Sequence, residues 1–208
     1  MEKLNLVIAF LSMLLFVHLS DSCCFPKQFE GFEEDVGVDF KTGIYSRALY
    51  EIHYDSTSKK VAFAGNATGK LVSGQVLLDF SAKKQYVVQD GKCSVSELNA
   101  PMLDCLPGKP FKSTHYGIGN NKVDIDVYKV ENGIDFTVTR NECAIMTTRA
   151  ESKDSIADRE FRGLTLGIKD MSVFDVPKAC QNGTSTSPIS RMMHRMMETR
   201  HSVFLRHH

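Results

Sequence analysis

Side chains that could perform acid–base or metal chemistry are present in this sequence, but they do not stand in the patterns that such chemistry needs. His53 and His115 belong to no metal-ligand or triad motif. A Gly-x-Ser-x-Gly nucleophile elbow and a His-Glu-x-x-His zinc helix are both absent from the sequence. We therefore predict that the protein is not an enzyme, assign no catalytic residue and expect no required cofactor.

Acidic side chains gather at two places where oxygen ligands could surround a hard cation such as calcium. Asp124 and Asp126 share one face of a predicted strand, and the other group consists of Glu33, Glu34, Asp35 and Asp39. The calcium-loop pattern of alternating Asp or Asn, a central Gly and a terminal Glu is absent. The metal ligands are therefore unknown from the residues themselves.

The two ends of the chain differ from its middle. Residues 4–19 form an apolar run that follows Lys3 and precedes Ser20-Asp21-Ser22, which is typical of a secretory signal peptide over residues 1–22. The run is shorter than the roughly 20 residues of a membrane span, so we expect a secreted protein that is not transmembrane. One domain over residues 23–181 follows, and residues 182–208 form a polar, then basic and Met-rich tail that we expect to be disordered.

The charge and the cysteines limit the partners and the compartment. The formal net charge is zero, which offers no electrostatic basis for binding nucleic acid. Six cysteines behind a signal peptide, none of them in a Cys-x-x-Cys pair, indicate disulfides rather than a zinc site. Two Asn-x-Thr triplets predict N-glycans at Asn66, in an expected hairpin turn, and at Asn182, on the tail.

Alternation of apolar and polar residues is the dominant pattern between these ends. Residues 72–80 carry an apolar side chain or glycine at every second position, and Ala48, Tyr50, Ile52 and Tyr54 do the same. This period of two is typical of strands with one buried face. Residues 150–162 are polar enough to be a loop or a short exposed helix, and residues 99–121 have the composition of a long connection.

Residues 123–140 have the pattern of a hairpin. Asn132-Gly133 is the sequence preferred in a two-residue type I′ turn. With that turn, Glu131 faces Ile134 and Val127 faces Val138. This register places one apolar set on a common face: Val123, Ile125, Val127, Ile134, Phe136 and Val138. About nine to eleven such strands and almost no helix predict an all-β fold, an antiparallel two-sheet β-sandwich or half-open barrel.

Two blocks of the sequence resemble the ependymin family. Leu166 to Phe174, followed by Pro177 and Cys180, resembles its C-terminal signature, and Cys24-Phe25-Pro26-Lys27-Gln28-Phe29-Glu30-Gly31 resembles its N-terminal block. Shorter matches between them, at 46–49, 54–55 and 90–93, follow the family's order. The resemblance covers residues 24 to 180.

The resemblance implies part of the disulfide framework. It implies that Cys24 pairs with Cys143 and that Cys93 pairs with Cys180. Cys23 and Cys105 do not match the family pattern. Our hypothesis is that these two pair with each other, and the alternatives are an intermolecular bridge or free thiols.

The resemblance also implies a fold similar to lipid-carrier folds, with a deep apolar pocket, a homodimeric assembly and association with calcium, partly through acidic carbohydrate. The pocket candidates are Val76, Leu78, Phe80, Tyr86, Val88, Phe136 and Val138. An ordinary filled core requires the same alternation, so the pattern does not separate a filled interior from a hollow one.

Two functions remain open. The first is a secreted protein that binds a hydrophobic small molecule, such as a lipid or fatty acid, in its pocket. The second is a glycoprotein of the extracellular matrix or cell surface, acting in cell-matrix adhesion without a dedicated small ligand. The family includes lysosomal members, which makes the lysosome an alternative destination to secretion.

Overall fold

The computed structural model describes residues 23–69, 73–130 and 133–181. The predicted signal peptide, the tail with Asn182, and Asn132 of the predicted turn lie outside the described residues. The elements, in chain order, are β1 Cys23–Cys24, β2 Gln28–Asp39, β3 Ile44–Asp55, β4 Lys60–Ala67, β5 Gly74–Asp79, β6 Lys84–Gln89, β7 Lys92–Glu97, β8 Cys105–Leu106, β9 Lys112–Ile118, β10 Asn121–Val130, β11 Ile134–Thr139, β12 Ile145–Glu151, β13 Ser155–Leu166, the 3-10 helix η1 Met171–Phe174 and the helix α2 Lys178–Gln181.

The described strands form one large sheet and one small one. The large sheet has 11 strands in the order β7-β6-β5-β4-β3-β2-β13-β12-β11-β10-β9, and β1 pairs with β8 in a sheet of 2 strands. Neighbouring strands are antiparallel, and the end strands β7 and β9 are not paired with each other. The predicted all-β, antiparallel and open architecture is confirmed. Its two layers are the two halves of one sheet, because β2 and β13 pair along their length.

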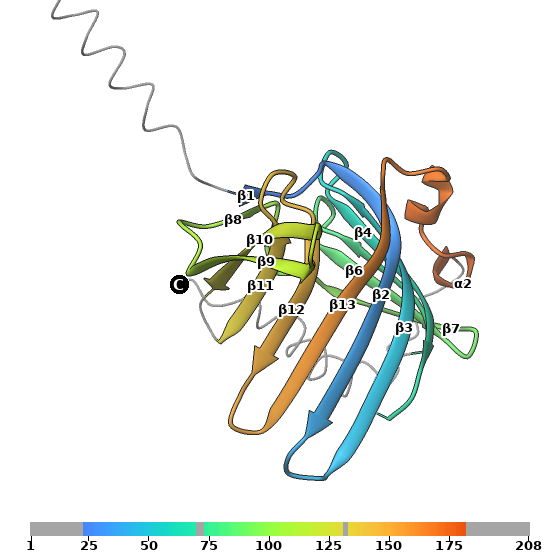
Figure 1. The fold of residues 1–208 in the computed structure, drawn as a ribbon. Coiled ribbons are helices and arrows are strands. Elements are labelled where there is room, and N and C mark those ends of the chain that lie inside the picture. Colours follow the sequence, from blue (N-terminus) through green and yellow to red (C-terminus); the bar gives the residue numbers. More distant parts are fainter. Residues whose placement is uncertain (1–22, 70–72, 131–132, 182–208) are drawn as a thin grey trace, which may run out of the picture.

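The large sheet is strongly curved, as Figure 1 shows. Side chains from β3, β4 and β5 and side chains from β10, β11 and β12 therefore belong to one hydrophobic cluster. This cluster lies on the concave side of the sheet. The concave side is where a core or a cavity has to form, because it is the side that both halves share.

The prediction of a loop or short helix over residues 150–162 is wrong, because residues 150–151 belong to β12, residues 155–162 belong to β13, and only residues 152–154 form the turn between them. The polar residues of β13 find charged partners across the strand boundary with β2. Arg159 Nε lies 3.1 Å from Asp35 Oδ1, and Arg162 Nη2 lies 3.0 Å from Glu34 Oε2. Cross-strand ion pairs of this kind support a strand without an alternating apolar pattern.

The register of the β10–β11 hairpin differs from the predicted one by one residue. Val130 pairs with Ile134 and Tyr128 pairs with Phe136, so three residues connect the strands instead of two. The shift turns Asp126, Tyr128 and Val130 toward the concave side, and it leaves Val123 46% exposed. Asp126 tolerates this placement because Arg140 Nε lies 3.1 Å from its Oδ1. The predicted apolar face with Val123 and Val127 is therefore wrong.

The hairpins β2–β3, β3–β4, β5–β6 and β11–β12 share one turn design. In each, the last residue of the first strand, Asp or Thr, accepts hydrogen bonds from backbone N–H groups of the loop, as Asp55 Oδ1 does from Thr57 at 2.8 Å and Ser58 at 3.2 Å. Four residues later the backbone has a positive φ: 66° at Gly43, 56° at Lys59, 53° at Lys83 and 49° at Cys143. Asp and Thr suit the first position because their side chains accept hydrogen bonds from the loop backbone. Gly43 suits the second position because glycine adopts a positive φ without steric cost.

Lys59→Gly is expected to raise the free energy of unfolding by up to about 1 kcal/mol, because a side chain destabilises the left-handed conformation and glycine adopts it freely. Urea denaturation followed by circular dichroism measures the change. Lys84→Gly, in the exposed first position of β6, is the control and is expected to lower stability. Equal effects of the two substitutions would contradict the prediction.

Acid pH is expected to weaken the β3–β4 turn. Burial by itself would raise the pKa of Asp55, but hydrogen bonds from Ser58, Gln28 and Thr57 outweigh it and hold the pKa below its ordinary value. A group with a lowered pKa contributes fully above its unfolded pKa, about 3.9. The contribution is lost as pH falls from there through the folded pKa.

Urea denaturation between pH 7 and pH 3 tests this expectation. Asp55→Asn should lower the free energy of unfolding by about 1–3 kcal/mol at pH 7, because charge-assisted hydrogen bonds are lost. The deficit should shrink below about pH 4, where the wild-type carboxylate also loses its charge. A deficit that stays constant down to pH 3 would contradict the assignment.

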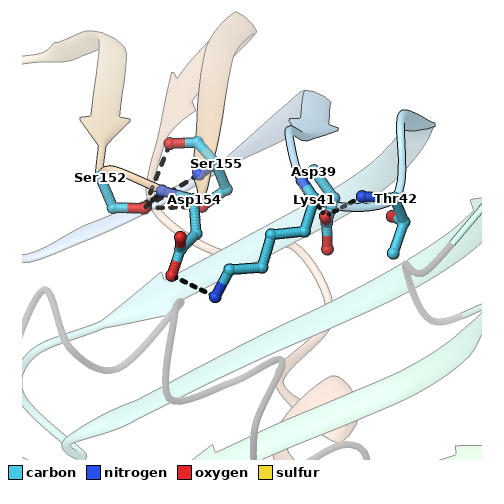
Figure 2. A network of polar contacts seen from close by, with 6 residues as sticks. All are labelled: Asp39, Lys41, Thr42, Ser152, Asp154 and Ser155. Carbon is cyan, nitrogen blue, oxygen red and sulfur yellow. Dashed lines mark hydrogen bonds and ion pairs between the residues drawn. The ribbon is translucent and has the colours of Figure 1, made fainter.

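The tips of two long hairpins are tied together at one edge of the fold. Figure 2 shows Asp39 capping the β2–β3 turn through the backbone N–H groups of Lys41 and Thr42. Lys41 Nζ lies 2.7 Å from Asp154 Oδ2 in the β12–β13 turn, and the Ser152 hydroxyl accepts from the backbone of that turn. The central strands of the sheet are therefore held together at their ends as well as along their lengths.

The C-terminal segment covers the convex side of β4–β6. Phe174 of η1 is buried with Ala62, Leu77 and Tyr86, and its carbonyl oxygen accepts a hydrogen bond of 3.2 Å from Lys60 Nζ. Cys180 of α2 is bonded to Cys93 of β7. These strands are therefore apolar on both faces, which is typical of a sheet region covered on both sides.

The structure pairs Cys93 with Cys180, in the way the resemblance implies, and pairs the other cysteines differently. The bonds are Cys23–Cys143 and Cys24–Cys105, so the expected pairs Cys24–Cys143 and Cys23–Cys105 are not formed. Strand pairing is the reason. Cys24 lies opposite Cys105 in the β1–β8 sheet, and Cys23, pointing to the other face, is buried in the core cluster beside Cys143.

Asn66 lies in β4, opposite Leu49 of β3, and not in the expected hairpin turn. The strand continues to residue 67 because the Ser73 hydroxyl hydrogen-bonds both the N–H and the carbonyl oxygen of Ala67. Asn66 is exposed. Its glycosylation stays a prediction.

Candidate functional site

An apolar cavity of about 140 Å³ lies on the concave side of the sheet. Strands from both halves of the sheet and the connection after β7 contribute to its wall. The lining residues are Phe25, Phe29, Glu33, Ile52, Tyr54, Val61, Phe63, Val76, Leu78, Phe80, Met102, Leu103, Phe136, Ile145, Thr148, Arg159 and Phe161. A cavity of this size holds a benzene-sized group.

Aromatic rings form one side of the cavity. Phe29 and Tyr54, cross-strand neighbours on β2 and β3, stack with ring centroids 4.7 Å apart. Phe25 lies edge-on to Tyr54 at 6.4 Å and 6.3 Å from Phe136, which comes from the other half of the sheet. Rings at these separations attract one another, and they join the N-terminal segment to both halves.

Disulfides fix the segments that cover the aromatic side of the cavity, namely those after β1 and before β8. Phe25 follows β1, and Met102 and Leu103 precede β8. The Cys24–Cys105 bond joins these two parts of the cover, and the Cys23–Cys143 bond joins β1 to the loop between β11 and β12. The Tyr54 hydroxyl donates a hydrogen bond of 3.0 Å to the carbonyl oxygen of Leu103. Burial, with the nearby Asp104 carboxylate, raises the pKa of Tyr54, so the hydroxyl keeps the proton that it donates.

Charged side chains form a small polar region in the cavity wall. Arg159 Nε lies 3.1 Å from Asp35 Oδ1 and 3.7 Å from Glu33 Oε1, and both carboxylates are buried. Thr148 lies opposite Arg159 on β12 and is buried as well. Groups of opposite charge reduce the cost of burying one another, and they give an otherwise apolar cavity one polar region.

Four of the predicted pocket residues line the cavity, namely Val76, Leu78, Phe80 and Phe136. Val138 is 0% exposed and belongs to the packed core beside the cavity. Tyr86 and Val88 are not at the cavity, because β6 has the opposite phase. Tyr86 lies opposite Leu77, and both pack on the convex side under Phe174. Val88 lies opposite Gln75 and is half-buried.

The sequence interpretation missed residues that cover the cavity and residues that give it charge. Met102 and Leu103 lie in a proline-rich connection without a period, and no local signal points to them. Glu33 and Arg159 did have a signal. Glu33 lies two positions after Gly31 and four after Phe29, so it shares a strand face with Phe29. Arg159 lies two positions before Phe161 and so shares a strand face with that ring.

The carboxylates considered as calcium ligands are engaged by arginines. Glu34 pairs with Arg47 and Arg162, while Asp124 and Asp126 both pair with Arg140. Asp39 caps a turn. Within residues 23–69, 73–130 and 133–181, no group of three or more His, Cys, Asp and Glu side chains has an arrangement that could hold a metal ion.

One curated relative shares most of its length with this chain. It is the ependymin-related protein 1 of Haliotis asinina, 26% identical over 182 residues that cover 76% of this chain and 90% of the relative. This relative supports the resemblance to the ependymin family. No protein-family model matches it.

Two solved structures are similar to this chain in their backbone. An uncharacterized conserved protein from Thermus thermophilus has a TM-score of 0.48 and 7% identity, covering 74% of this chain and 87% of its own. A LolA superfamily protein from Nitrosomonas europaea has a TM-score of 0.40 and 7% identity, covering 73% and 92%.

The three disulfides suit an oxidising, extracellular setting. Among its described helices, none has the length and apolar character that crossing a membrane requires.

Proposed function

We propose that this protein is a secreted binding protein whose concave cavity holds an apolar small molecule or the apolar part of a lipid. The observation that carries the proposal is the cavity itself, about 140 Å³ and lined mainly by aliphatic and aromatic side chains from both halves of the sheet. Binding sites for small molecules are concave, mostly apolar and supplied with few polar groups. A longer chain would leave the cavity through its open side.

Native mass spectrometry of the glycosylated protein, purified from a eukaryotic secretory host, tests the proposal. We expect a co-purifying ligand in near-stoichiometric amount, which organic extraction releases. A clean mass of the protein alone that gains nothing on incubation with lipids or alkyl ligands would contradict the proposal and favour the matrix-interaction alternative. The predicted homodimer would appear in the same spectra at twice the protomer mass.

Association with calcium stays a prediction, and we propose that glycans carry it. The support is that the protein carboxylates considered above are paired with arginines or cap a turn. Calorimetric titration with calcium before and after enzymatic removal of the glycans measures the contribution of each. Calcium binding that survives deglycosylation unchanged would contradict the proposal.

A further inference from the structure

The polar region of the cavity contains two carboxylates and one guanidinium. Glu33 lines the cavity, and Asp35 lies two residues further along β2, on the same face. Arg159 is the cation paired with both, so the three side chains together carry a formal charge of −1. Glu33 and Arg159 are the charged members of the described cavity wall.

The two carboxylates share Arg159 unequally. Its Nε forms an ion pair with each of them, at 3.1 Å from Asp35 Oδ1 and at 3.7 Å from Glu33 Oε1. Glu33 is the carboxylate that faces the cavity. A carboxylate has about four lone-pair sites for hydrogen bonds, so Glu33 can accept from a ligand in addition to its contacts within the protein.

We propose that Glu33 selects the polar group of the ligand, so that the cavity prefers an alkyl ammonium group over a carboxylate. This inference rests on the proposed function. An ammonium group beside Glu33 would bring the local formal charge from −1 to zero and would donate to the carboxylate. A fatty-acid carboxylate would bring it to −2 in an apolar environment, where like charges repel strongly.

The proposed selectivity favours alkyl amines within the hydrophobic ligands predicted from the sequence, which also include fatty acids. A fatty acid and a long-chain amine offer the same apolar chain to the aromatic side of the cavity. They differ only at the end that meets Glu33. The charge balance of the cavity wall, and not its apolar surface, therefore distinguishes them.

Three ligands with the same chain test the proposal, namely octylamine, octanol and octanoate, each titrated into ligand-stripped protein at pH 7 by calorimetry. We expect octylamine to bind about tenfold or more tightly than octanoate, with octanol between them, since a charge-assisted hydrogen bond is worth at least that ratio. Octanoate that binds as tightly as octylamine would overturn the inference and leave the proposed function standing. Failure of all three to bind would overturn both.

A pair of variants assigns the preference to one side chain. Glu33→Gln keeps the shape and removes the charge, and we expect it to reduce octylamine affinity to that of octanol without weakening octanol. Glu34→Gln is the matched control, because Glu34 is the next residue and faces the other side, toward Arg47 and Arg162. An unchanged amine preference in folded Glu33→Gln would overturn the assignment. If this variant does not fold, the comparison of the three ligands on the wild-type protein still decides the inference.

Discussion

Val76→Phe is expected to weaken the binding of apolar ligands at least tenfold, the largest effect on binding that we expect from a single substitution. Val76 lies in β5, is buried, and contributes its side chain directly to the cavity wall. A phenyl ring at this position would occupy a large part of a cavity of about 140 Å³, because a space of that size accommodates one benzene ring. Calorimetric titration with octanol measures the loss.

Stability distinguishes a filled cavity from a damaged fold. Overpacking a filled core typically costs about 1–3 kcal/mol, whereas a ring that enters an existing cavity should leave the free energy of unfolding within about 1 kcal/mol of the wild type. Val123→Phe, on the exposed part of β10, is the control and should change neither quantity. Unweakened binding in folded Val76→Phe would show that the ligand lies elsewhere.

Replacing Cys93 and Cys180 together by serine is expected to lower the free energy of unfolding by about 2–5 kcal/mol, the largest effect on stability. The bond joins residues separated by 87 positions and fastens α2 to the edge strand β7. Its loss also loosens the cover that Phe174 forms over Leu77 and Tyr86. The convex face of β4–β6 would then be exposed to water.

Urea denaturation of the secreted double variant measures the loss of stability. Lys92→Ser is the matched control, because it places a serine beside Cys93 on the same strand and keeps the bond. Ligand binding should be retained, since the cavity lies on the concave side and the C-terminal segment covers the other side. A double variant as stable as the control would contradict the role assigned to this disulfide.

Alternation predicted the strands well where one face was apolar and the other polar. In β3, Ala48, Tyr50, Ile52 and Tyr54 are buried on one side as their spacing predicted. The same reasoning failed for β6, where Tyr86 and Val87 are both buried. A strand that is covered on both faces has no polar side to define its phase, so its neighbours and not its own pattern decide which residues face the cavity.

The predicted register of the β10–β11 hairpin was wrong for a related reason. Asn132-Gly133 predicts a two-residue turn, and with that turn Val123 and Val127 belong to the predicted apolar face. The structure uses three connecting residues, which buries Tyr128 and Asp126 instead. Asp126 can be buried only because Arg140 reaches it from the end of β11, a contact that no local pattern reveals.

The order of residues determined the class of the protein. The period of two, the turn residues at strand ends and the family's cysteines indicated an antiparallel, disulfide-bonded fold with apolar strand faces, since these features depend on neighbours in the chain. Only the tertiary structure decided which of these faces encloses a cavity, which cysteine of the pair at 23 and 24 meets Cys143, and that Glu33 and Arg159 lie in the wall. These outcomes depend on how far the sheet curves and on contacts between residues separated by more than a hundred positions, and a linear pattern contains neither.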